Sequence, residues 1–233
     1  MTDVNIVIFD VDGVLLDSLS AHLQVCRDEA KRLGLKIEIP SVEEFRKLVS
    51  HGAIISPMAE FFRSVGFPAA QAQVANEDYR REFGQKYHVG LFPGIPNMLA
   101  EVAATGIGLG IVTSNTRRNI SSALGHALKL FDRRCIFADD DSRRVTKAEA
   151  LKNCASIRGV KPEAALYVGD QPRDFAAAQL AQVQFLGVTY GWGIEPDETR
   201  FPIAHSPNDI AAYIGARRNR HLHETTHSGS NSL

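Results

Sequence analysis

Residues 5–18 read NIVIFDVDGVLLDS, a short apolar run that ends in two aspartates and a glycine. Asn5–Phe9 is apolar throughout after its first residue, which is typical of a strand buried on both faces of a parallel sheet. Further short apolar runs follow, and they alternate with stretches that carry apolar residues at helical spacing. This alternation predicts an α/β fold: a doubly wound parallel sheet with helices on both faces.

The remaining strands of this sheet, and the helices between them, are expected after residue 90. We expect strands at Ile107–Val112, Arg134–Phe137, Ala165–Val168 and Val183–Thr189. We expect helices at Ile95–Thr105, Asn119–Leu130, Lys147–Arg158 and Arg173–Ala181. Gly106 suits the end of the first of these helices, because glycine readily takes the left-handed conformation found at helix C-termini.

Residues 16–90 show helical patterns and no convincing strand. Helices are expected at residues 17–34, 41–50, 56–65 and 69–88. Ser41 followed by Glu44 is the sequence pattern of a capping box. We therefore predict an α-helical cap at residues 16–90, inserted into an α/β core formed by residues 1–15 and 91–215. Leu15–Ser18 and Gly90–Pro93 are its expected hinges. Residues 216–233 are polar, which indicates a flexible tail.

Composition excludes several other classes of protein. The chain has 233 residues, 44% of them hydrophobic, and a formal net charge of −1. This is enough apolar material for a core, and the charge offers no field to attract nucleic acid or a membrane surface. No apolar run approaches the ~18 residues that span a bilayer, and the first residues lack a secretory signal. Three cysteines without a C-x-x-C pair are typical of reduced thiols. We expect a cytoplasmic protein with no nucleic-acid or membrane partner.

Polar residues gather where the expected strands end. In an open parallel sheet, ligands bind beyond the carboxyl ends of the strands. The residues at these ends, or at the start of the helix after the third strand, are Asp10, Asp12, Thr113, Ser114, Asn115, Lys147, Asp170 and Asp174. We expect them to meet at one edge of the sheet.

Converging carboxylates indicate a metal ion. They would repel one another and raise each other's pKa unless a cation lay between them, and all-oxygen ligation suits Mg2+. Asp10, Asp170 and the backbone carbonyl of Asp12 are the predicted ligands. Asp174 is expected to hydrogen-bond to these ligands, or to contact the metal ion through a water molecule.

The same residues suit phosphoryl transfer. Asp10 can attack phosphorus and form an aspartyl-phosphate, which divides one difficult step into two. Asp12 is the predicted acid and base, because it lies two residues after Asp10 and can reach over the site from the loop. The predicted phosphate ligands, which supply positive charge or hydrogen-bond donors, are Thr113, Ser114, Asn115 and Lys147. Of these, Thr113 and Lys147 are also expected to take part in catalysis.

Four motifs carry a resemblance to a known superfamily. FDVDGVLLDS resembles the D-x-D-G motif of the haloacid dehalogenase superfamily, and GIVTSN resembles its second motif, a strand that ends in Thr113. Lys147 in RRVTKAEAL is similar to the third motif, and GDQPRD is similar to the fourth, G-D-x-x-x-D. All four stand in the family's order over most of the chain.

The resemblance implies a Rossmann-like core and an activity. The helical insertion resembles the cap of the phosphoglycolate-phosphatase-like subgroup, whose members are mostly Mg2+-dependent phosphatases of small metabolites. Asp12 favours a phosphatase, since true dehalogenases lack this second aspartate. Two positions depart from the pattern: Ser20 stands where phosphomutase-like members usually have proline, and Gln171–Arg173 replaces small polar residues.

We therefore expect an Mg2+-dependent phosphomonoesterase that hydrolyses a small, phosphoglycolate-like metabolite. Two alternatives remain open: a phosphomutase of the β-phosphoglucomutase type, and a non-catalytic regulator that binds a phosphorylated ligand. The cap residues expected to contact the leaving group of the substrate are Arg46, Lys47, Ser50, His51 and Arg63. The sequence leaves open the physiological substrate and the choice between monomer and homodimer.

Overall fold

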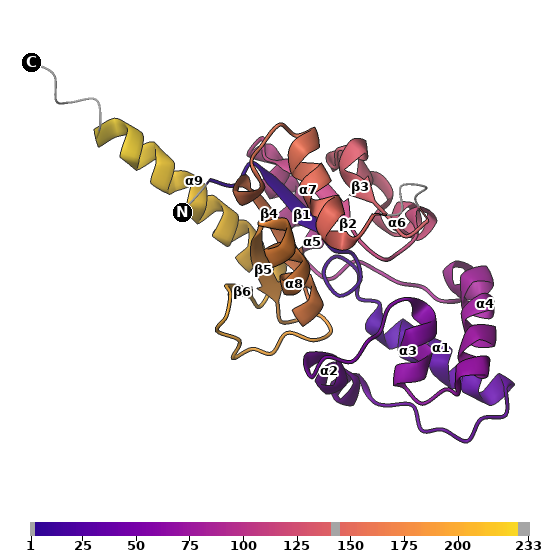
Figure 1. Ribbon diagram of the computed structural model, residues 1–233. Helices are drawn as coiled ribbons and strands as arrows, with labels where there is room; N and C mark the ends of the chain where they lie inside the picture. Colours follow the sequence, from indigo (N-terminus) through magenta and orange to yellow (C-terminus); the bar gives the residue numbers. More distant parts are fainter. Residues whose placement is uncertain (1–2, 141–144, 228–233) are drawn as a thin grey trace, which may run out of the picture.

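A parallel sheet lies at the centre of the α/β part of the molecule (Figure 1). The structure, a computed structural model, describes residues 3–140 and 145–227. Within these residues the strands are ordered β3-β2-β1-β4-β5-β6, and each neighbouring pair is parallel. The strands are β1 (Ile6–Phe9), β2 (Gly108–Val112), β3 (Ile136–Phe137), β4 (Ala165–Gly169), β5 (Gln184–Val188) and β6 (Ile203–Ala204).

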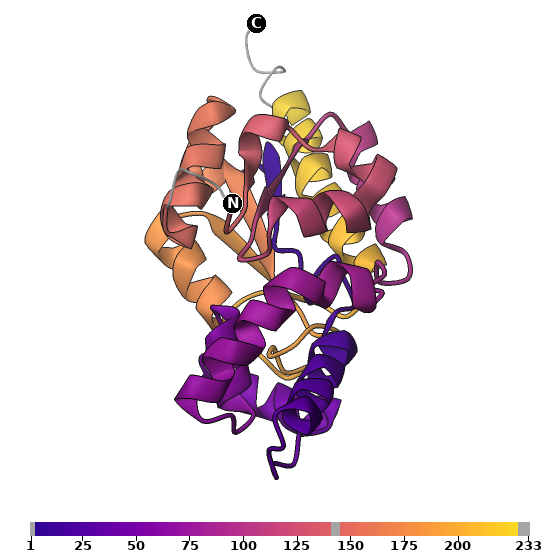
Figure 2. The same cartoon turned by 90° about the vertical axis from the view of Figure 1, so that its right-hand side faces the viewer.

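Helices cover both faces of this sheet (Figure 2). One face carries α5 (Ile95–Ala104), α6 (Arg117–Leu124) and α9 (Pro207–His227), and the other carries α7 (Lys147–Ile157) and α8 (Pro172–Ala181). Along β1, Val7 and Phe9 pack with the first set, whereas Ile6 and Ile8 pack with the second. All four are fully buried, which explains the unbroken apolar run. The predicted doubly wound sheet is confirmed.

Four helices form a separate unit beside the sheet, coloured indigo to magenta in Figure 1. This helical unit consists of α1 (Leu19–Arg32), α2 (Val42–Ser50), α3 (Met58–Ser64) and α4 (Ala69–Lys86). Its buried side chains form an apolar cluster separate from the two clusters beside the sheet, and Phe45 and Phe62 are completely buried. The predicted capping box is present, because the Ser41 hydroxyl accepts from the Glu44 N–H at 3.2 Å and the Glu44 carboxylate accepts from the Ser41 N–H at 2.8 Å. We propose that this unit is the cap.

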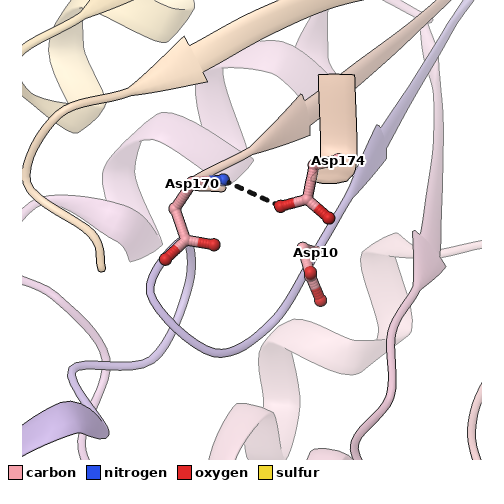
Figure 3. Close-up of side chains that lie close together, drawn as sticks. All are labelled: Asp10, Asp170 and Asp174. Atoms are coloured by element: carbon pink, nitrogen blue, oxygen red, sulfur yellow. Dashed lines mark hydrogen bonds between the residues drawn. The ribbon is translucent and has the colours of Figure 1, made fainter. Parts of the chain in front are cut away.

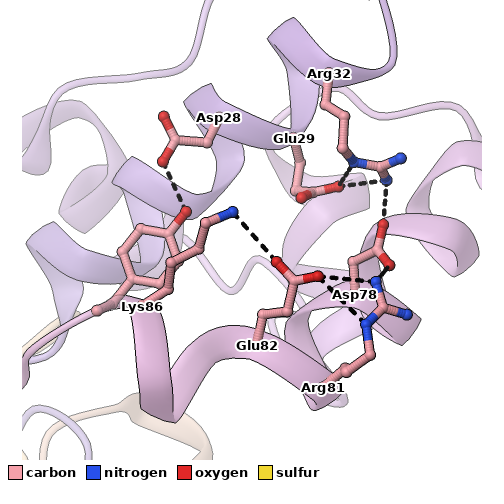
Figure 4. Close-up of polar contacts among 8 residues, drawn as sticks. Asp28, Glu29, Arg32, Asp78, Arg81, Glu82 and Lys86 are labelled. Carbon is pink, nitrogen blue, oxygen red and sulfur yellow. Dashed lines mark hydrogen bonds and ion pairs between the residues drawn. The ribbon is translucent and has the colours of Figure 1, made fainter.

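One ion pair joins α1 to α4, and one hydrogen bond joins α1 to the residue after α4 (Figure 4). Arg32 lies 2.5 Å from Asp78 and 2.6 Å from Glu29. The Tyr87 hydroxyl, just after α4, donates to the Asp28 carboxylate at 2.7 Å. Because the Arg32 side chain is 45% exposed, each of its ion pairs contributes about 1 kcal/mol or less. The buried aromatic cluster therefore stabilises the unit more than these pairs do.

Two chain segments connect the helical unit to the sheet, and they lie side by side. The Asp17 N–H donates to the Gly90 carbonyl at 3.0 Å, and the Phe92 N–H donates to the Leu15 carbonyl at 3.0 Å. These are the segments expected to act as hinges. Because the two segments are hydrogen-bonded to each other, a motion of the helical unit relative to the sheet must move both of them.

Strand β3 is shorter than expected. The prediction of a strand over Arg134–Phe137 was wrong at its start, because Arg133–Cys135 forms a 3-10 turn that is capped by the Asp132 side chain. Strand β6 was not expected at all, since a two-residue strand carries no periodic pattern. Most other expected elements are present with small shifts at their ends.

The helix expected at Asn119–Leu130 is interrupted. Helix α6 ends at Leu124, and Gly125 has a φ of +50°, outside the helical range. The chain continues to Leu130 as a 3-10 helix. The apolar spacing continues through the interruption, so that periodicity alone predicted one helix where there are two.

The carboxyl-terminal segment is helical up to His227. That residues 216–233 form a flexible tail stays a prediction. Ile210, Ala211 and Ile214 anchor the first half of α9 in the core beside α5. The helix then continues past the sheet, as Figure 1 shows, where it needs no apolar face. Residues 228–233 lie outside the described residues. None of the described helices, α9 included, is both long enough and apolar enough to cross a membrane.

Candidate active site

Three aspartates from separate segments meet where β1 and β4 end (Figure 3). Asp10 follows β1, Asp170 follows β4, and Asp174 lies in the first turn of α8. The parallel pairing of β1 with β4 brings the first two together. One carboxylate oxygen of each lies within 4.8 Å of the others, and all three side chains are buried.

The ammonium group of Lys147 contacts two of these carboxylates. It donates to Asp10 Oδ2 at 2.8 Å and to Asp174 Oδ1 at 2.6 Å. Lys147 is the first residue of α7, whose start is fixed by a capping box between Thr146 and Glu149. Local capping therefore sets the position of the lysine at the sheet edge.

Backbone N–H groups orient Asp170 and Asp174. Asp174 Oδ2 accepts from the N–H groups of Asp170 and Gln171 at 3.2 and 3.1 Å. Asp170 Oδ2 accepts from the Trp192 N–H at 2.7 Å, and the Asp170 carbonyl accepts from the Gly193 N–H at 3.0 Å. The other carboxylate oxygen of Asp170 has only a 3.4 Å contact with the Gln171 side chain. This oxygen is thus the least engaged of the cluster.

Two glycines allow the chain to approach Asp170 closely. A Cβ on Gly13 would lie 1.9 Å from Asp170 Oδ2, and a Cβ on Gly191 would lie 2.3 Å from Asp170 Cβ. Gly13 also has a φ of +78°, which glycine adopts without strain. The glycine of D-x-D-G is therefore required by both the backbone conformation and the close approach.

Burial and charge shift the pKa values of this cluster in different directions. Burial raises the pKa of Asp170 well above its usual range, and the charges of Asp174 and Asp10 raise it further. Burial also acts to raise the pKa of Asp10, but the charge and hydrogen bond of Lys147 outweigh it and leave that pKa lowered. Burial acts to lower the pKa of Lys147, but the charges of Asp10 and Asp174 outweigh it and leave that pKa raised. Asp10 and Lys147 therefore form an ionised pair.

The donor set fits a divalent cation. Asp170 is fully buried, its pKa is raised, and one of its oxygens is only weakly engaged. A nearby cation would stabilise its ionised form, and carboxylate oxygens are the ligands that Mg2+ prefers. Lys147 alone, bonded to Asp10 and Asp174, does not neutralise the three carboxylates.

The side chain of Asp12 lies outside this group of three and pairs with Asn115. Asn115 Nδ2 donates to Asp12 Oδ2 at 2.8 Å. Asp12 Oδ1 is buried and has no hydrogen-bond partner among the described residues. Burial raises the pKa of Asp12, and the charge of Asp10 adds to this. The charge of His22, the nearby Ser18 hydroxyl and the Asn115 amide offset the rise only in part. A carboxyl group with a raised pKa and an unpartnered oxygen is suited to give and take a proton.

Thr113, Ser114 and Asn115 follow β2 at the same edge. A hydrogen bond between the Thr113 hydroxyl and Asp10 helps to lower the pKa of Asp10. The Asn115 N–H donates to the Thr113 hydroxyl at 3.2 Å, so this N–H group is engaged. Helix α6 starts at Arg117, after the N-cap Thr116. Ser114 and Asn115 therefore precede the helix and do not form its first turn.

A cavity of about 90 Å³ lies between the sheet edge and the helical unit. Asp10, Asp12 and Arg173 line it from the sheet side. From the helical unit, its lining includes Ser56, Phe61, His22, Asn76, Tyr79 and Arg80. A wider cleft of about 860 Å³ shares Tyr79 and Arg80 and reaches Thr113 and Lys147. The space beside the aspartates is therefore bounded by α4.

The cap residues expected to contact a substrate do not line this cavity or the wider cleft. Arg46 donates to the Tyr190 carbonyl at 2.6 Å and so connects α2 to the loop after β5. The other four residues each contact a group in their own helix or at its end: Lys47, Ser50, His51 and Arg63. The reason is the packing of α2. This helix buries Phe45 and Val49, and its polar residues do not line the cavity or the cleft. The face of α4 that carries Asn76, Tyr79 and Arg80 lines the cavity in their place.

Several residues at the site were not expected from the sequence. Arg173 lines the cavity, and its Nε is buried without a hydrogen-bond partner in the described part of the chain. His22 is buried beside Asp12, with Nδ1 2.7 Å from the Ser18 carbonyl and Nε2 3.2 Å from the Tyr79 hydroxyl. The spacing of residues 76, 79, 80 and 83 on α4 was the one available sign of a common face.

Comparisons with known proteins find similar sequences over most of the chain. A profile of haloacid dehalogenase-like hydrolases matches residues 7–188. The 5'-nucleotidase of Pseudomonas aeruginosa is 29% identical over 218 residues, 91% of this chain and 93% of its own. The N-acetylmuramic acid 6-phosphate phosphatase of the same bacterium is 30% identical over 203 residues, 82% of this chain and 84% of its own. The phosphoglycolate phosphatase of Synechococcus elongatus is 29% identical over 191 residues, 80% of this chain and 84% of its own.

A solved structure has the same arrangement of elements. The haloacid dehalogenase-like hydrolase of Streptococcus pneumoniae superimposes with a TM-score of 0.75 at 25% identity. The match covers 91% of this chain and 99% of that one. The sheet and the helical unit are therefore matched together.

Proposed function

Since the chain belongs to the haloacid dehalogenase-like hydrolase family, we propose that it is an Mg2+-dependent phosphomonoesterase that acts through an aspartyl-phosphate at Asp10. The observation that carries this proposal is the contact of Lys147 with both Asp10 and Asp174, beside the third buried carboxylate of Asp170. An ionised aspartate held by an ammonium group, with a proton donor two residues away, is what nucleophilic attack on a phosphate ester requires.

In the first half of the reaction, the Asp10 carboxylate attacks phosphorus. A bond forms between the aspartate oxygen and phosphorus, and the ester P–O bond breaks. The leaving alkoxide takes a proton from Asp12, whose raised pKa favours the protonated form. Lys147 holds Asp10 in place and supplies positive charge beside the phosphoryl group.

In the second half, water attacks the phosphoryl group and gives its proton to Asp12. The bond between Asp10 and phosphorus breaks, inorganic phosphate leaves, and both aspartates return to their starting state. Thr113 and Ser114 are the proposed donors to the remaining phosphoryl oxygens. Mg2+, held by Asp10, Asp170 and the Asp12 carbonyl, would neutralise charge on the phosphate when bound.

The proposed substrate is a small, phosphoglycolate-like metabolite. Two of the relatives above are named for phosphoglycolate and N-acetylmuramic acid 6-phosphate, each of which carries a carboxylate as well as a phosphate. In this chain, Arg80 of α4 lines the same cavity as Asp10. Its ion pair with Asp139 is long, at 3.8 Å, and exposed. Arg80 is therefore free to bind a carboxylate of the substrate.

The test is a hydrolysis assay with and without Mg2+. We expect phosphate release from p-nitrophenyl phosphate, and faster release from phosphoglycolate than from N-acetylmuramic acid 6-phosphate or a nucleoside 5'-monophosphate. Chelation with EDTA should abolish release, and added Mg2+ should restore it. Conversion of a hexose 1-phosphate to the 6-phosphate would favour the mutase alternative. Micromolar ligand binding without turnover of any ester would favour the regulator.

Arg173 is expected to bind the phosphoryl group beside Lys147. It lines the cavity with Asp10, and its buried Nε has no hydrogen-bond partner among the described residues. Arg173→Gln should lower kcat for p-nitrophenyl phosphate by about 10²-fold, the typical effect of removing one donor to a developing charge. Because this substrate has no second anionic group, the loss would report on the phosphoryl group itself.

Arg63→Gln is the matched control for Arg173. Arg63 pairs with Glu60 and lines neither the cavity nor the cleft, so its substitution should leave kcat unchanged. Inhibition by inorganic phosphate should weaken in Arg173→Gln and not in Arg63→Gln. An unaltered kcat in Arg173→Gln would show that this arginine only balances the acidic cluster.

A further inference from the structure

The loop after β5 holds Asp170 by two of its atoms. The Trp192 N–H donates to Asp170 Oδ2 at 2.7 Å. The next N–H group, of Gly193, donates to the Asp170 carbonyl at 3.0 Å. The orientation of this carboxylate therefore depends on where residues 192 and 193 lie.

The side chain of Trp192 belongs to the helical unit instead of the sheet. It is 5% exposed and lies in the apolar cluster of that unit. Its ring centroid lies 5.3 Å from His22, 5.9 Å from Phe61 and 6.4 Å from Phe45. All other buried members of this cluster in the described chain come from residues 19–83. One residue thus has its backbone at the aspartate cluster and its ring in the helical unit.

The rest of the loop has little room to move. A Cβ on Gly191 would lie 2.3 Å from Asp170 Cβ, and a Cβ on Gly193 would lie 2.4 Å from Val49 Cγ1 on α2. Arg46 on α2 donates to the Tyr190 carbonyl at 2.6 Å. The loop is therefore packed between Asp170 and α2, so a displacement of the helical unit would be transmitted to it.

We propose that Trp192 is a positioning residue that couples the placement of the helical unit to the orientation of Asp170, and so to Mg2+ binding. When the ring is seated in the cluster, the Trp192 N–H is held at Asp170 Oδ2, and the other oxygen of that carboxylate is left for the cation. When the ring leaves the cluster, Asp170 loses this donor. The coupling works both ways by thermodynamic linkage, so bound Mg2+ favours the docked helical unit. This inference rests on the proposed Mg2+ site.

Calorimetric titration of Mg2+ tests the coupling without relying on activity. Trp192→Ala should raise the Kd for Mg2+ about tenfold, because loss of the partners that orient a ligand typically weakens metal binding 10- to 100-fold. Trp192→Phe, which keeps an aromatic ring in the cluster, should raise it less. The same variants should regain most of the wild-type kcat at saturating Mg2+, since the affected quantity is metal affinity. If Trp192→Ala does not fold, Trp192→Phe carries this comparison.

Phe67→Leu is the matched control. This variant separates a general loss of packing in the cluster from loss of the connection between Trp192 and Asp170. Phe67 is buried in the same cluster, where its ring packs against Phe62, whereas the ring partners of Trp192 in the described chain are His22, Phe45 and Phe61. Phe67→Leu should lower the melting temperature and leave the Kd for Mg2+ unchanged. An equal rise of that Kd in Phe67→Leu and in Trp192→Ala would overturn the proposal.

The wild-type protein offers a direct second readout, because Trp192 is the single tryptophan of the chain. Its fluorescence should change saturably on addition of Mg2+, with the midpoint found by calorimetry. The change should be absent in Asp170→Asn. Calorimetric binding of Mg2+ to wild type with no fluorescence change would refute the coupling alone. No calorimetric binding of Mg2+ to wild type would instead refute the proposed metal site.

Discussion

Asp10→Asn should abolish phosphate ester hydrolysis, with a loss in kcat on the order of 10⁴-fold or more. The amide is close in size to the carboxylate but does not attack phosphorus. The variant should still fold, because Lys147 keeps its 2.6 Å bond to Asp174 and the β1 backbone is unchanged. Steady-state assays with p-nitrophenyl phosphate measure the loss, and circular dichroism with thermal unfolding checks the fold.

A trapping experiment identifies the nucleophile independently of rate. Mass spectrometry of acid-quenched wild-type enzyme should find a phosphoryl group on the peptide that contains Asp10, and Asp10→Asn should lack it. Asp17→Asn is the control, because Asp17 is exposed in the same segment and lines neither the cavity nor the cleft. Full turnover in Asp10→Asn would contradict the mechanism.

Lys147→Met should lower kcat by about 10³-fold and also destabilise the protein in the absence of Mg2+. Its ammonium group is bonded to Asp10 and Asp174, whose side chains are nearly or completely buried. Removing one partner of a buried ion pair typically costs about 3–5 kcal/mol, because the remaining charge is uncompensated. The loss in kcat follows from the missing positive charge at the phosphoryl group.

The measurements are kcat at saturating Mg2+ and the melting temperature with and without the ion. Mg2+ should recover part of the lost stability of Lys147→Met, since it supplies positive charge to the same carboxylates. It should not recover kcat. Lys152→Met, at an exposed position on the same helix, is the control and should change neither quantity. A melting temperature of Lys147→Met equal to that of wild type would show that the cluster is not held by this ion pair.

The site residues that the sequence predicted are those placed by strand ends and helix starts. Asp10 and Asp170 each follow a buried parallel strand, and Lys147 begins a helix with its own capping box. Strand ends and helix caps can be read from short segments, and the parallel sheet then brings such segments together at one edge. The three-aspartate cluster and its lysine were therefore within reach of sequence reasoning.

The substrate-facing residues were not predictable in the same way. Arg46 is polar and lies on a helix near the site, yet it bonds to the Tyr190 carbonyl. Arg80 lies on α4, two helices further along the chain, and it lines the cavity. Which face of a helix meets the sheet edge depends on how the helices of the unit pack on one another. Sequence periodicity shows that a helix has two faces, but not which partner each face contacts.

The sequence by itself determined the doubly wound sheet, the helical insertion and the convergence of Asp10, Lys147, Asp170 and Asp174, because each follows from local periodicity, capping and strand order. Only the tertiary structure decided that the Trp192 backbone holds Asp170 while its ring packs in the helical unit. The tertiary structure also decided that α4, and not α2, lines the cavity. Both depend on contacts between segments distant in the chain, and these are set by side-chain shape and close packing, which no local pattern records.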